Sequence, residues 1–431
     1  MHSRFFLSVT MTCFALGVGA CSSSTNTPGF GSSGTKSGSS GTSGTSTGSS
    51  GSKSGATGTS GATGTSGSTT GTSTGTAGTQ SGASGTSSTT SSLTGPPAGP
   101  YTVSGADILD KNGHKHLFRG LDRPSLEWSC SGDIATDEYV IMQSWGANVV
   151  RVALNQDCWL DDPSNSLYDS QYADTVDEQV TNAISAGLDI ILDLHWSDQG
   201  SYAEAKTCFN STAGCQQDMA DPHSVTFWQQ LAAKYASNPN VLFELYNEPH
   251  VGGYMPQSAD WTTWLNGGTS SGYTVVGMQQ LYTAVRMAGA TNLVVIGGLD
   301  WAYDLSGVPT HAVSGTNILY ATHPYDTSTS PNPTGWTQYF GSLSATYPVI
   351  ATEFGARGTT QPSGCSATFD TTFIQYADGK ASGSNPSQEL SWTAWAFYPG
   401  SCTFPPLIND QVAFTPNAPG MVVQTALTAG P

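Results

Sequence analysis

The stretch Val241-Leu242-Phe243-Glu244-Leu245-Tyr246-Asn247-Glu248-Pro249-His250 begins as an apolar run and ends in polar residues. The later stretch Val349–Gly355 has the same form and carries Glu353 near its end. Each pattern is typical of a short buried strand that finishes with a carboxylate. In a barrel of parallel strands, the strand ends lie together on the face that carries the active site. The two stretches therefore predict a pair of facing carboxylates, although either Glu alone could be an ordinary surface residue.

Six further segments have the same strand-like composition. The eight predicted strands are 116–123, 147–154, 188–196, 241–248, 292–299, 317–323, 348–354 and 390–398. Apolar residues at helical spacing predict helices at 172–187, 224–236 and 274–288, and a final helix around 421–429 is poorly marked. Repeated strand–helix units imply a parallel sheet, and eight of them predict a closed (β/α)8 TIM barrel. An open doubly wound sheet is the alternative, but no GxGxxG turn follows a strand.

The first 95 residues predict export and a flexible spacer. Residues 1–20 have the pattern of a signal peptide, with Arg4 before an apolar run. Val18-Gly19-Ala20-Cys21 resembles a bacterial lipobox, which implies lipidation at Cys21, and an ordinary signal peptide cut near a cysteine is the alternative. Residues 21–95 are almost entirely Gly, Ser and Thr and predict a disordered linker spanning on the order of 45 Å. We expect an exported protein, either a cell-envelope lipoprotein facing outward or a secreted protein.

The ordered domain is expected over 96–431, beginning with a small hairpin lid at 101–115 that turns at Asn112-Gly113. Six cysteines remain in the chain after Cys13 and Cys21, and an even number in an exported protein suggests disulfides. Closeness in sequence favours Cys208–Cys215. The less supported pairings are Cys130–Cys158 and Cys365–Cys402. The paired CxxC spacing of zinc sites is missing from the sequence, so no metal site is expected.

The charge of the chain excludes some partners. It carries 31 Asp and Glu against 13 Lys and Arg, a net charge of −18, which argues against nucleic acid and anionic lipid as partners. Membrane contact is therefore expected only through a lipid anchor. A neutral polysaccharide is compatible, because 11 Trp and 17 Tyr supply aromatic faces on which sugar rings stack. The same aromatics could equally be ordinary core residues. We expect a monomer.

Polar residues gather at the predicted strand ends. They are Arg151, His195, Trp196, Asn247, Glu248, His323, Tyr325, Glu353 and Trp395. Polar groups in apolar strands are costly unless paired, so these side chains are expected to meet. Arg151 would hold Glu353 ionised, and Tyr325 would orient it by a hydrogen bond. His195 and His323 could bind sugar hydroxyls or tune proton affinities, and Trp395 could form the floor under the sugar.

Two details of this site depend on local geometry. Asn247 precedes Glu248, so the two side chains should point to opposite sides of a regular strand unless the barrel rim twists or bulges. Trp159, Trp196 and Trp301 follow predicted strands and are candidate stacking platforms along a cleft, with ordinary core packing as the alternative for each.

From about Leu117 to Tyr398 the chain resembles glycoside hydrolase family 5, the cellulase family A. The motif Phe243–Pro249 and the order of Arg151, His195, His323, Tyr325, Glu353 and Trp395 carry the resemblance. It implies a (β/α)8 barrel and a retaining double displacement without a cofactor. Glu248 would be the acid/base, with a raised pKa, and Glu353 the nucleophile. Asn247 would bind the sugar 2-hydroxyl.

The resemblance leaves the substrate open. The family often has Asn at the end of strand one, where Leu121-Asp122 stands, so no role is assigned there. We expect an endo-acting hydrolase of β-1,4-glucan. The alternatives are a β-mannanase or another β-glucan hydrolase, and a non-catalytic glycan-binding lipoprotein, which the presence of both glutamates disfavours. A metal-dependent hydrolase would need clustered His and Asp ligands.

Overall fold

The computed structural model describes residues 97–160, 171–198, 216–358 and 365–430. The predicted signal peptide, Cys21, the linker and the Cys208–Cys215 pair lie outside the described residues. Within the described part of the chain, every helix is too short or too polar to cross a lipid bilayer.

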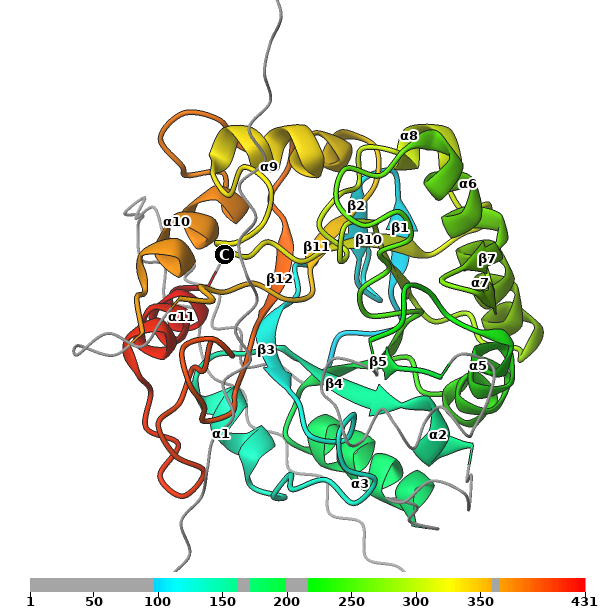
Figure 1. The fold of residues 1–431 in the computed structure, drawn as a ribbon. Coiled ribbons are helices and arrows are strands. Elements are labelled where there is room, and N and C mark those ends of the chain that lie inside the picture. The colour runs from blue at the N-terminus through cyan, green and yellow to red at the C-terminus, as the bar shows by residue number, and fades with distance from the viewer. Residues whose placement is uncertain (1–96, 161–170, 199–215, 359–364, 431) are drawn as a thin grey trace, which may run out of the picture. The chain divides into compact units, whose positions relative to one another are not determined.

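Eight parallel strands close into a barrel at the centre of the domain (Figure 1). The strands are β3 (Arg119–Arg123), β4 (Val149–Asn155), β5 (Asp189–Trp196), β6 (Val241–Glu244), β9 (Val294–Gly297), β10 (Ile318–Thr322), β11 (Val349–Ala351) and β12 (Ser391–Ala394). They neighbour one another in chain order, and β12 closes on β3 where Trp392 pairs with Arg119. The predicted (β/α)8 barrel is therefore confirmed, and each strand falls within one residue of its predicted segment or inside it.

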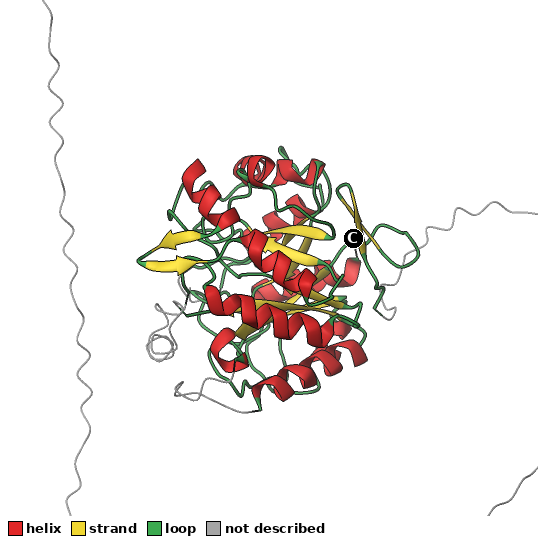
Figure 2. Cartoon of the chain, turned by 90° about the vertical axis from the view of Figure 1, so that its right-hand side faces the viewer, coloured by secondary structure: helices red, strands yellow, loops and turns green. Residues whose placement is uncertain are grey.

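Helices cover the outside of the barrel (Figure 2). They are α1 (Glu138–Ser144), α2 (Gln156–Trp159), α3 (Tyr172–Ser185), α5 (Pro222–Tyr235), α6 (Ser258–Asn266), α7 (Met278–Met287), α8 (Val308–His311), α9 (Pro333–Tyr339), α10 (Thr368–Ala377) and α11 (Ala418–Ala429), with a 3-10 turn at Gly341–Ala345. Local sequence explains their ends: α5 starts where Asp221 caps the His223 N–H and Pro222 occupies the first turn. The Trp228 indole on α5 then donates to the Leu245 carbonyl at 3.0 Å.

The core has two layers. One cluster fills the barrel interior and includes Val149, Ile191, Leu242, Val295 and Ile350. A larger cluster lies between strands and helices and includes the neighbours of Leu242 in β6, Val241 and Phe243. This alternation follows from the two-residue period of a strand, and it leaves the barrel interior packed rather than open.

The N-terminal hairpin exists, but its predicted turn was wrong. Strands β1 (Thr102–Ser104) and β2 (Asp107–Leu109) pair across Gly105-Ala106, because Gly105 adopts the positive φ of 61° that the tight turn requires. Asn112-Gly113 forms a second turn further on, where the Gly113 N–H donates to the Asp110 carbonyl. The Tyr101 hydroxyl donates to Asp189, the first residue of β5. The hairpin therefore covers the N-terminal end of the barrel and is no lid over the carboxylates.

Two disulfides connect loops on the barrel. Cys130–Cys158 joins the loop after β3 to α2, and Cys365–Cys402 joins the segment before α10 to the loop after β12. Both pairings that sequence spacing supported only weakly are confirmed. A second small hairpin, β7 (Gly268–Ser270) and β8 (Tyr273–Val275), follows α6. Its Ser270 hydroxyl donates to Asp218 at 2.6 Å.

Candidate active site

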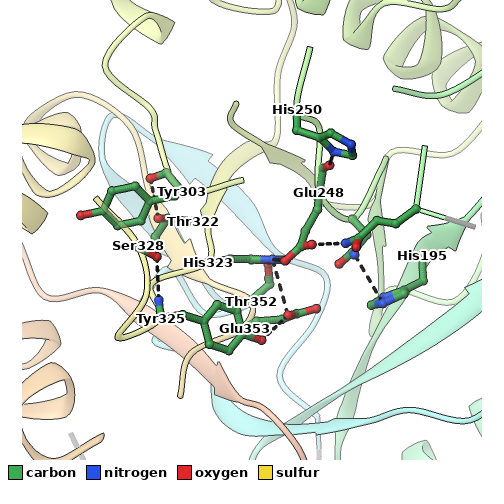
Figure 3. Close-up of polar contacts among 12 residues, drawn as sticks. His195, Glu248, His250, Tyr303, Thr322, His323, Tyr325, Ser328, Thr352 and Glu353 are labelled. Atoms are coloured by element: carbon green, nitrogen blue, oxygen red, sulfur yellow. Dashed lines mark hydrogen bonds and ion pairs between the residues drawn. The ribbon is translucent and has the colours of Figure 1, made fainter. Parts of the chain in front are cut away.

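Glu248 and Glu353 line one cavity of about 300 Å³ at the C-terminal ends of the barrel strands. A carboxylate oxygen of each lies within 4.8 Å of the other (Figure 3). Glu353 lies two residues beyond β11, and Glu248 lies four residues beyond β6. β6 ends at Glu244, earlier than predicted, and the chain bends at Leu245 and Asn247. That bend at the rim brings both Asn247 and Glu248 to the cavity, as a regular strand could not.

His323 lies between the two carboxylates (Figure 3). Its Nδ1 is 3.1 Å from Glu248 Oε1 and 3.6 Å from Glu353 Oε2, and its Nε2 is 3.0 Å from Thr352 Oγ1. Burial lowers the pKa of His323, but Glu353, Glu244 and Glu248 outweigh burial and raise the pKa to about 10. The imidazole is therefore a cation at neutral pH.

The expected raised pKa of Glu248 is wrong: the structure indicates a lowered one. Burial raises the pKa, but the hydrogen bond and charge of His323 outweigh burial and leave it below its ordinary value. Gln216 also donates to Glu248 Oε2. The proton thus lies on His323 rather than on Glu248.

Arg151 holds Glu353 from the barrel interior. Its Nη1 donates to Glu353 Oε1 at 2.8 Å, and the Tyr325 hydroxyl donates to Glu353 Oε2 at 2.5 Å. The Arg151 Nη2 also donates to Asn247 Oδ1 at 2.7 Å. These donors fix both oxygens of the Glu353 carboxylate and compensate its negative charge. The positions agree with those expected from the sequence.

Three buried acidic residues around Arg151 escaped the sequence analysis. Arg151 Nε is 2.5 Å from Glu244, and its terminal nitrogens lie 3.0 Å from Asp193 and 3.4 Å from Asp122. Burial raises the pKa of Asp122 and of Asp193, because one guanidinium cannot compensate every carboxylate around it. The signal was present in the sequence, since each is an ionisable residue inside a predicted buried strand.

His195, Asn247 and Trp395 form one side of the cavity. His195 Nδ1 lies 2.7 Å from Asp193 Oδ2, and its Nε2 lies 3.4 Å from Asn247 Nδ2. Its ring stacks on Trp395 with the centroids 5.6 Å apart and the planes 15° apart. Burial lowers the pKa of His195, so this ring is neutral at pH 7. Trp196, at the end of β5, lines the same cavity.

A second cavity of about 270 Å³ adjoins the first and is lined by Glu248 but not by Glu353. Trp301 lines it and stacks on His250, with the centroids 4.6 Å apart. Trp301 is thus placed at a cleft surface, as the sequence suggested. Trp159 does not lie at a cleft surface, because its side chain is 8% exposed and packs edge-on against Phe227 in the core. The sequence pattern does not distinguish these two tryptophans, because both follow strands.

Other residues that line the cavities were missed by sequence reasoning. They are Glu127, Trp128, Gln216, Tyr254, Arg357 and Phe404. All lie in loops or rim segments, where strand patterns carry no information. Among the described residues, two clusters are close enough to hold a cation. They are Glu248–His323–Glu353 and Asp198–Asp221–His223. In the first, the proton on His323 occupies the nitrogen lone pair that a metal would need.

Comparison with known proteins places this site in context. Endoglucanase N of Pectobacterium atrosepticum is 27% identical over 235 residues, which cover 53% of this chain and 43% of the relative. An endoglucanase of Clostridium saccharobutylicum is 22% identical over 303 residues, which cover 69% of this chain and 57% of the relative. The chain thus spans about half the length of these curated relatives.

Solved structures share the fold. A β-glucanase from Saccharophagus degradans superposes with a TM-score of 0.57 at 23% identity, covering 76% of this chain and 92% of that one. The catalytic domain of a Thermobifida fusca endoglucanase superposes with a TM-score of 0.53 at 20% identity, covering 77% and 99%. The model of the family described as cellulase (glycosyl hydrolase family 5) matches residues 109–401. That match spans more than half of the sequence, and the chain belongs to glycosyl hydrolase family 5.

Proposed function

We propose that the protein is an endo-acting β-glycosidase that hydrolyses β-1,4-glucan by a retaining double displacement. The observation that carries the proposal is the pair of carboxyl groups, Glu248 and Glu353, with oxygens within 4.8 Å of each other. Retaining glycosidases hold their carboxyl groups about 5–5.5 Å apart, whereas inverting enzymes need a gap of about 6.5–9.5 Å for a water molecule. The names of the relatives, endoglucanases, support the reaction class.

In the first step, the Glu353 carboxylate attacks the anomeric carbon of the sugar. The glycosidic C–O bond breaks, and the leaving oxygen takes a proton from Glu248. Arg151 and Tyr325 hold Glu353 in position for the attack. In the second step, a water molecule gives a proton to Glu248 and attacks the glycosyl-enzyme ester. The sugar leaves with retained configuration, and the Glu353 carboxylate is restored.

Glu248 and His323 share a proton that the first step consumes and the second step replaces. It lies on His323, whose Nδ1 is 3.1 Å from Glu248 Oε1. Glu248 receives that proton across this contact as the leaving oxygen develops negative charge. Esterification removes the charge of Glu353, which is the largest of the effects that raise the pKa of His323. The pair is then left without a proton and accepts one from the attacking water.

The two adjoining cavities support a division of the substrate between them. The cavity that contains Glu353 takes the sugar that becomes covalently attached, together with the chain on its non-reducing side. The cavity with Glu248 alone takes the leaving portion, with Trp301 as a stacking surface. Sites on both sides of the scissile bond are what an endo-acting enzyme requires. The β-1,4-glucan assignment rests on the relatives' names, and the S. degradans β-glucanase has also been solved in complex with cellotetraose.

A product profile of the full chain tests the substrate. Carboxymethylcellulose, barley β-glucan, xyloglucan, galactomannan and laminarin would each be incubated with the protein. Rapid viscosity loss on carboxymethylcellulose, with short cello-oligosaccharides as products, is the expected result. Activity confined to galactomannan would keep the mechanism and replace the substrate. If the protein hydrolysed none of these glycans, the proposal would be overturned in favour of a glycan-binding protein.

The two glutamates are tested separately. Glu353→Ala should abolish turnover without loss of fold, whereas Glu178→Ala, which changes an exposed glutamate on α3, should leave turnover unchanged. Glu248→Ala should stay slow on natural glycans, but added azide should restore turnover of an aryl glycoside with a good leaving group. Full activity of Glu353→Ala, or no azide rescue of Glu248→Ala, would contradict the respective role.

We further propose that the protein is exported and anchored by lipid at Cys21. The lipobox-like sequence Val18–Cys21 and the long Gly/Ser/Thr segment that follows it support this. Cys21→Ser should move the protein from the membrane fraction to the soluble fraction. Membrane association that persists in this variant would refute lipidation at that residue.

A further inference from the structure

A third carboxyl group lies in the cavity that contains Glu248 and Glu353, and it takes no part in the proposed double displacement. It belongs to Glu127, in the loop that follows β3, and its side chain is only 1% exposed. Trp128 and His195 line the same cavity beside it. A buried carboxyl group that borders a substrate cavity is placed to meet a ligand rather than bulk solvent.

The loop holds this carboxyl group in a fixed position. The Ser125 N–H donates to Glu127 Oε2 at 2.7 Å, and the Asn155 side chain donates to the Glu127 carbonyl at 2.8 Å. The Cys130–Cys158 disulfide ties the same loop to α2. Ser125 has a φ of 137°, a backbone conformation that residues other than glycine rarely adopt. Strain of this kind persists where the surrounding structure holds a functional group in place.

The charge of Glu127 is not compensated by a cation. Within the described parts of the chain, no Lys or Arg forms an ion pair with it, and Ser125 is the only other residue that hydrogen-bonds to its carboxyl group. Burial raises the pKa of Glu127 to about 7, although the hydrogen bond from the Ser125 N–H acts in the opposite direction. A glutamine or an apolar residue would stabilise the fold more at this position, because a buried carboxyl group without a cation is costly. The carboxyl group therefore points to a role in binding.

The residues around Glu127 indicate which part of the substrate it contacts. It lines the cavity that contains the proposed nucleophile and is not part of the second cavity, which contains Glu248 and Trp301. Trp128, half-buried beside it, packs edge-on against Tyr398 and Phe404. An aromatic ring next to a carboxyl group offers an apolar face for a sugar ring and a hydrogen-bonding partner for its hydroxyls.

We propose that Glu127 is a specificity-determining residue that hydrogen-bonds to hydroxyl groups of the β-linked sugar on the non-reducing side of the scissile bond. This inference rests on the proposed function, since it uses the same cleft. In its protonated form the carboxyl group donates to one sugar oxygen and accepts from another, and in its ionised form it can only accept. The affinity for the non-reducing portion of the substrate therefore changes with pH near neutrality.

The test compares the full chain with three variants, Glu127→Ala, Glu127→Gln and Glu178→Gln. Glu178 is an exposed glutamate on the outer helix α3 and provides a matched control. Cellotetraose and cellopentaose would be hydrolysed across pH 5–9, with initial rates and the position of the first cleaved bond recorded. Thermal melting would verify the fold of each variant.

Glu127→Ala should raise KM for cellotetraose by about 10- to 100-fold, the effect of losing a hydrogen bond to a charged or strongly polar group, with a smaller change in kcat. The first cleavage should also move along the oligosaccharide. Glu127→Gln, whose amide donates and accepts like the protonated acid, should keep the parent's low KM at pH 5. It should also lose the change in KM that the parent shows near pH 7.

Several results would overturn the inference. Unchanged KM, cleavage position and pH profile in Glu127→Ala would do so while leaving the proposed function intact. A uniform fall in kcat with a lowered melting temperature, and no change in cleavage position, would make Glu127 a structural residue. If the parent hydrolyses no glycan, the proposed function fails, and calorimetry with cellotetraose decides on Glu127. Equal binding by parent and Glu127→Ala, or binding by neither, would then refute its role.

Discussion

His323 should set the alkaline limit of activity, and His323→Asn is the change that tests this. The imidazolium lies 3.1 Å from Glu248 and 3.6 Å from Glu353, and it carries the proton that the reaction needs. The amide nitrogen of Asn can occupy the place of Nδ1 and donate to Glu248. The variant therefore removes the positive charge and the titratable proton while keeping one hydrogen bond.

The size of the effect follows from the charges. Two unit charges about 4 Å apart interact by roughly 4 kcal/mol at an effective dielectric constant of 20, which corresponds to about three pH units. In the parent the pKa of His323 is raised to about 10, so the shared proton is lost only in strongly alkaline solution. In the variant the proton must lie on Glu248 itself. Because the variant lacks that attraction, the pKa of Glu248 should rise by about three units above its depressed value, and this pKa becomes the alkaline limit, which lies below the limit of the parent near pH 10.

The assay is the pH dependence of kcat/KM on an aryl β-cellobioside, because this ratio reports the ionisations of the free enzyme. The expected result is a parent that stays active towards pH 10 and a variant that begins to lose activity, about tenfold per pH unit, at a lower pH than the parent. His114→Asn is the control, since the His114 side chain is 79% exposed. Recovery of activity on return to neutral pH would show that titration, rather than unfolding, is measured. An alkaline limb that is identical in parent and variant would refute the shared proton.

Three further predictions concern stability and binding. Burial raises the pKa of Asp189 to about 8, so the parent should lose stability between about pH 4 and 8 as this group ionises in the unfolded chain but not in the folded one. Asp189→Asn cannot ionise and should therefore gain stability relative to the parent over this range. Denaturation of both proteins at pH 4 and pH 9 measures the difference. An equal difference at both pH values would contradict this. Replacing Cys130 and Cys158 together by Ala should lower the free energy of unfolding by about 3–4 kcal/mol, measured by urea denaturation, because the disulfide closes a loop of 28 residues. No change on reduction of the parent would argue against the bond. Trp301→Ala should raise KM for cellopentaose about tenfold, which corresponds to about 1.4 kcal/mol, and should leave KM for an aryl cellobioside unchanged. Equal effects on both substrates would show that Trp301 does not contact the leaving portion of the substrate.

The fold was predictable because its signals are local. A buried strand of a parallel barrel is a short apolar run, and eight such runs stand in the sequence with helical periodicity between them. The ends of the strands were predicted less well. Leu245 and Tyr246 continue the apolar run beyond Glu244, yet β6 ends at Glu244 and their side chains belong to the core between strands and helices. The Leu245 carbonyl accepts from Trp228, and the Tyr246 hydroxyl donates to the Gln217 carbonyl. Composition alone does not separate a strand residue from a buried residue just past the strand.

The positions of the candidate site residues were also predictable, but their protonation was not. Arg151, Asn247, His323, Tyr325 and Glu353 meet at one barrel face because strand ends must meet there. The predicted raised pKa of Glu248 failed because it ignored the distance to His323. The signal peptide, the lipid anchor and the linker stay predictions.

The sequence by itself determined the barrel, the pair of glutamates and the family, because strand periodicity and a short motif are properties of neighbouring residues. Tertiary structure alone decided which group holds the proton, which tryptophan is buried and that Glu127 enters the cavity. These depend on burial and on distances through space. Arg151 and Glu353 are 202 residues apart in the chain and 2.8 Å apart in the fold, and the electrostatics of the site follow from the second number.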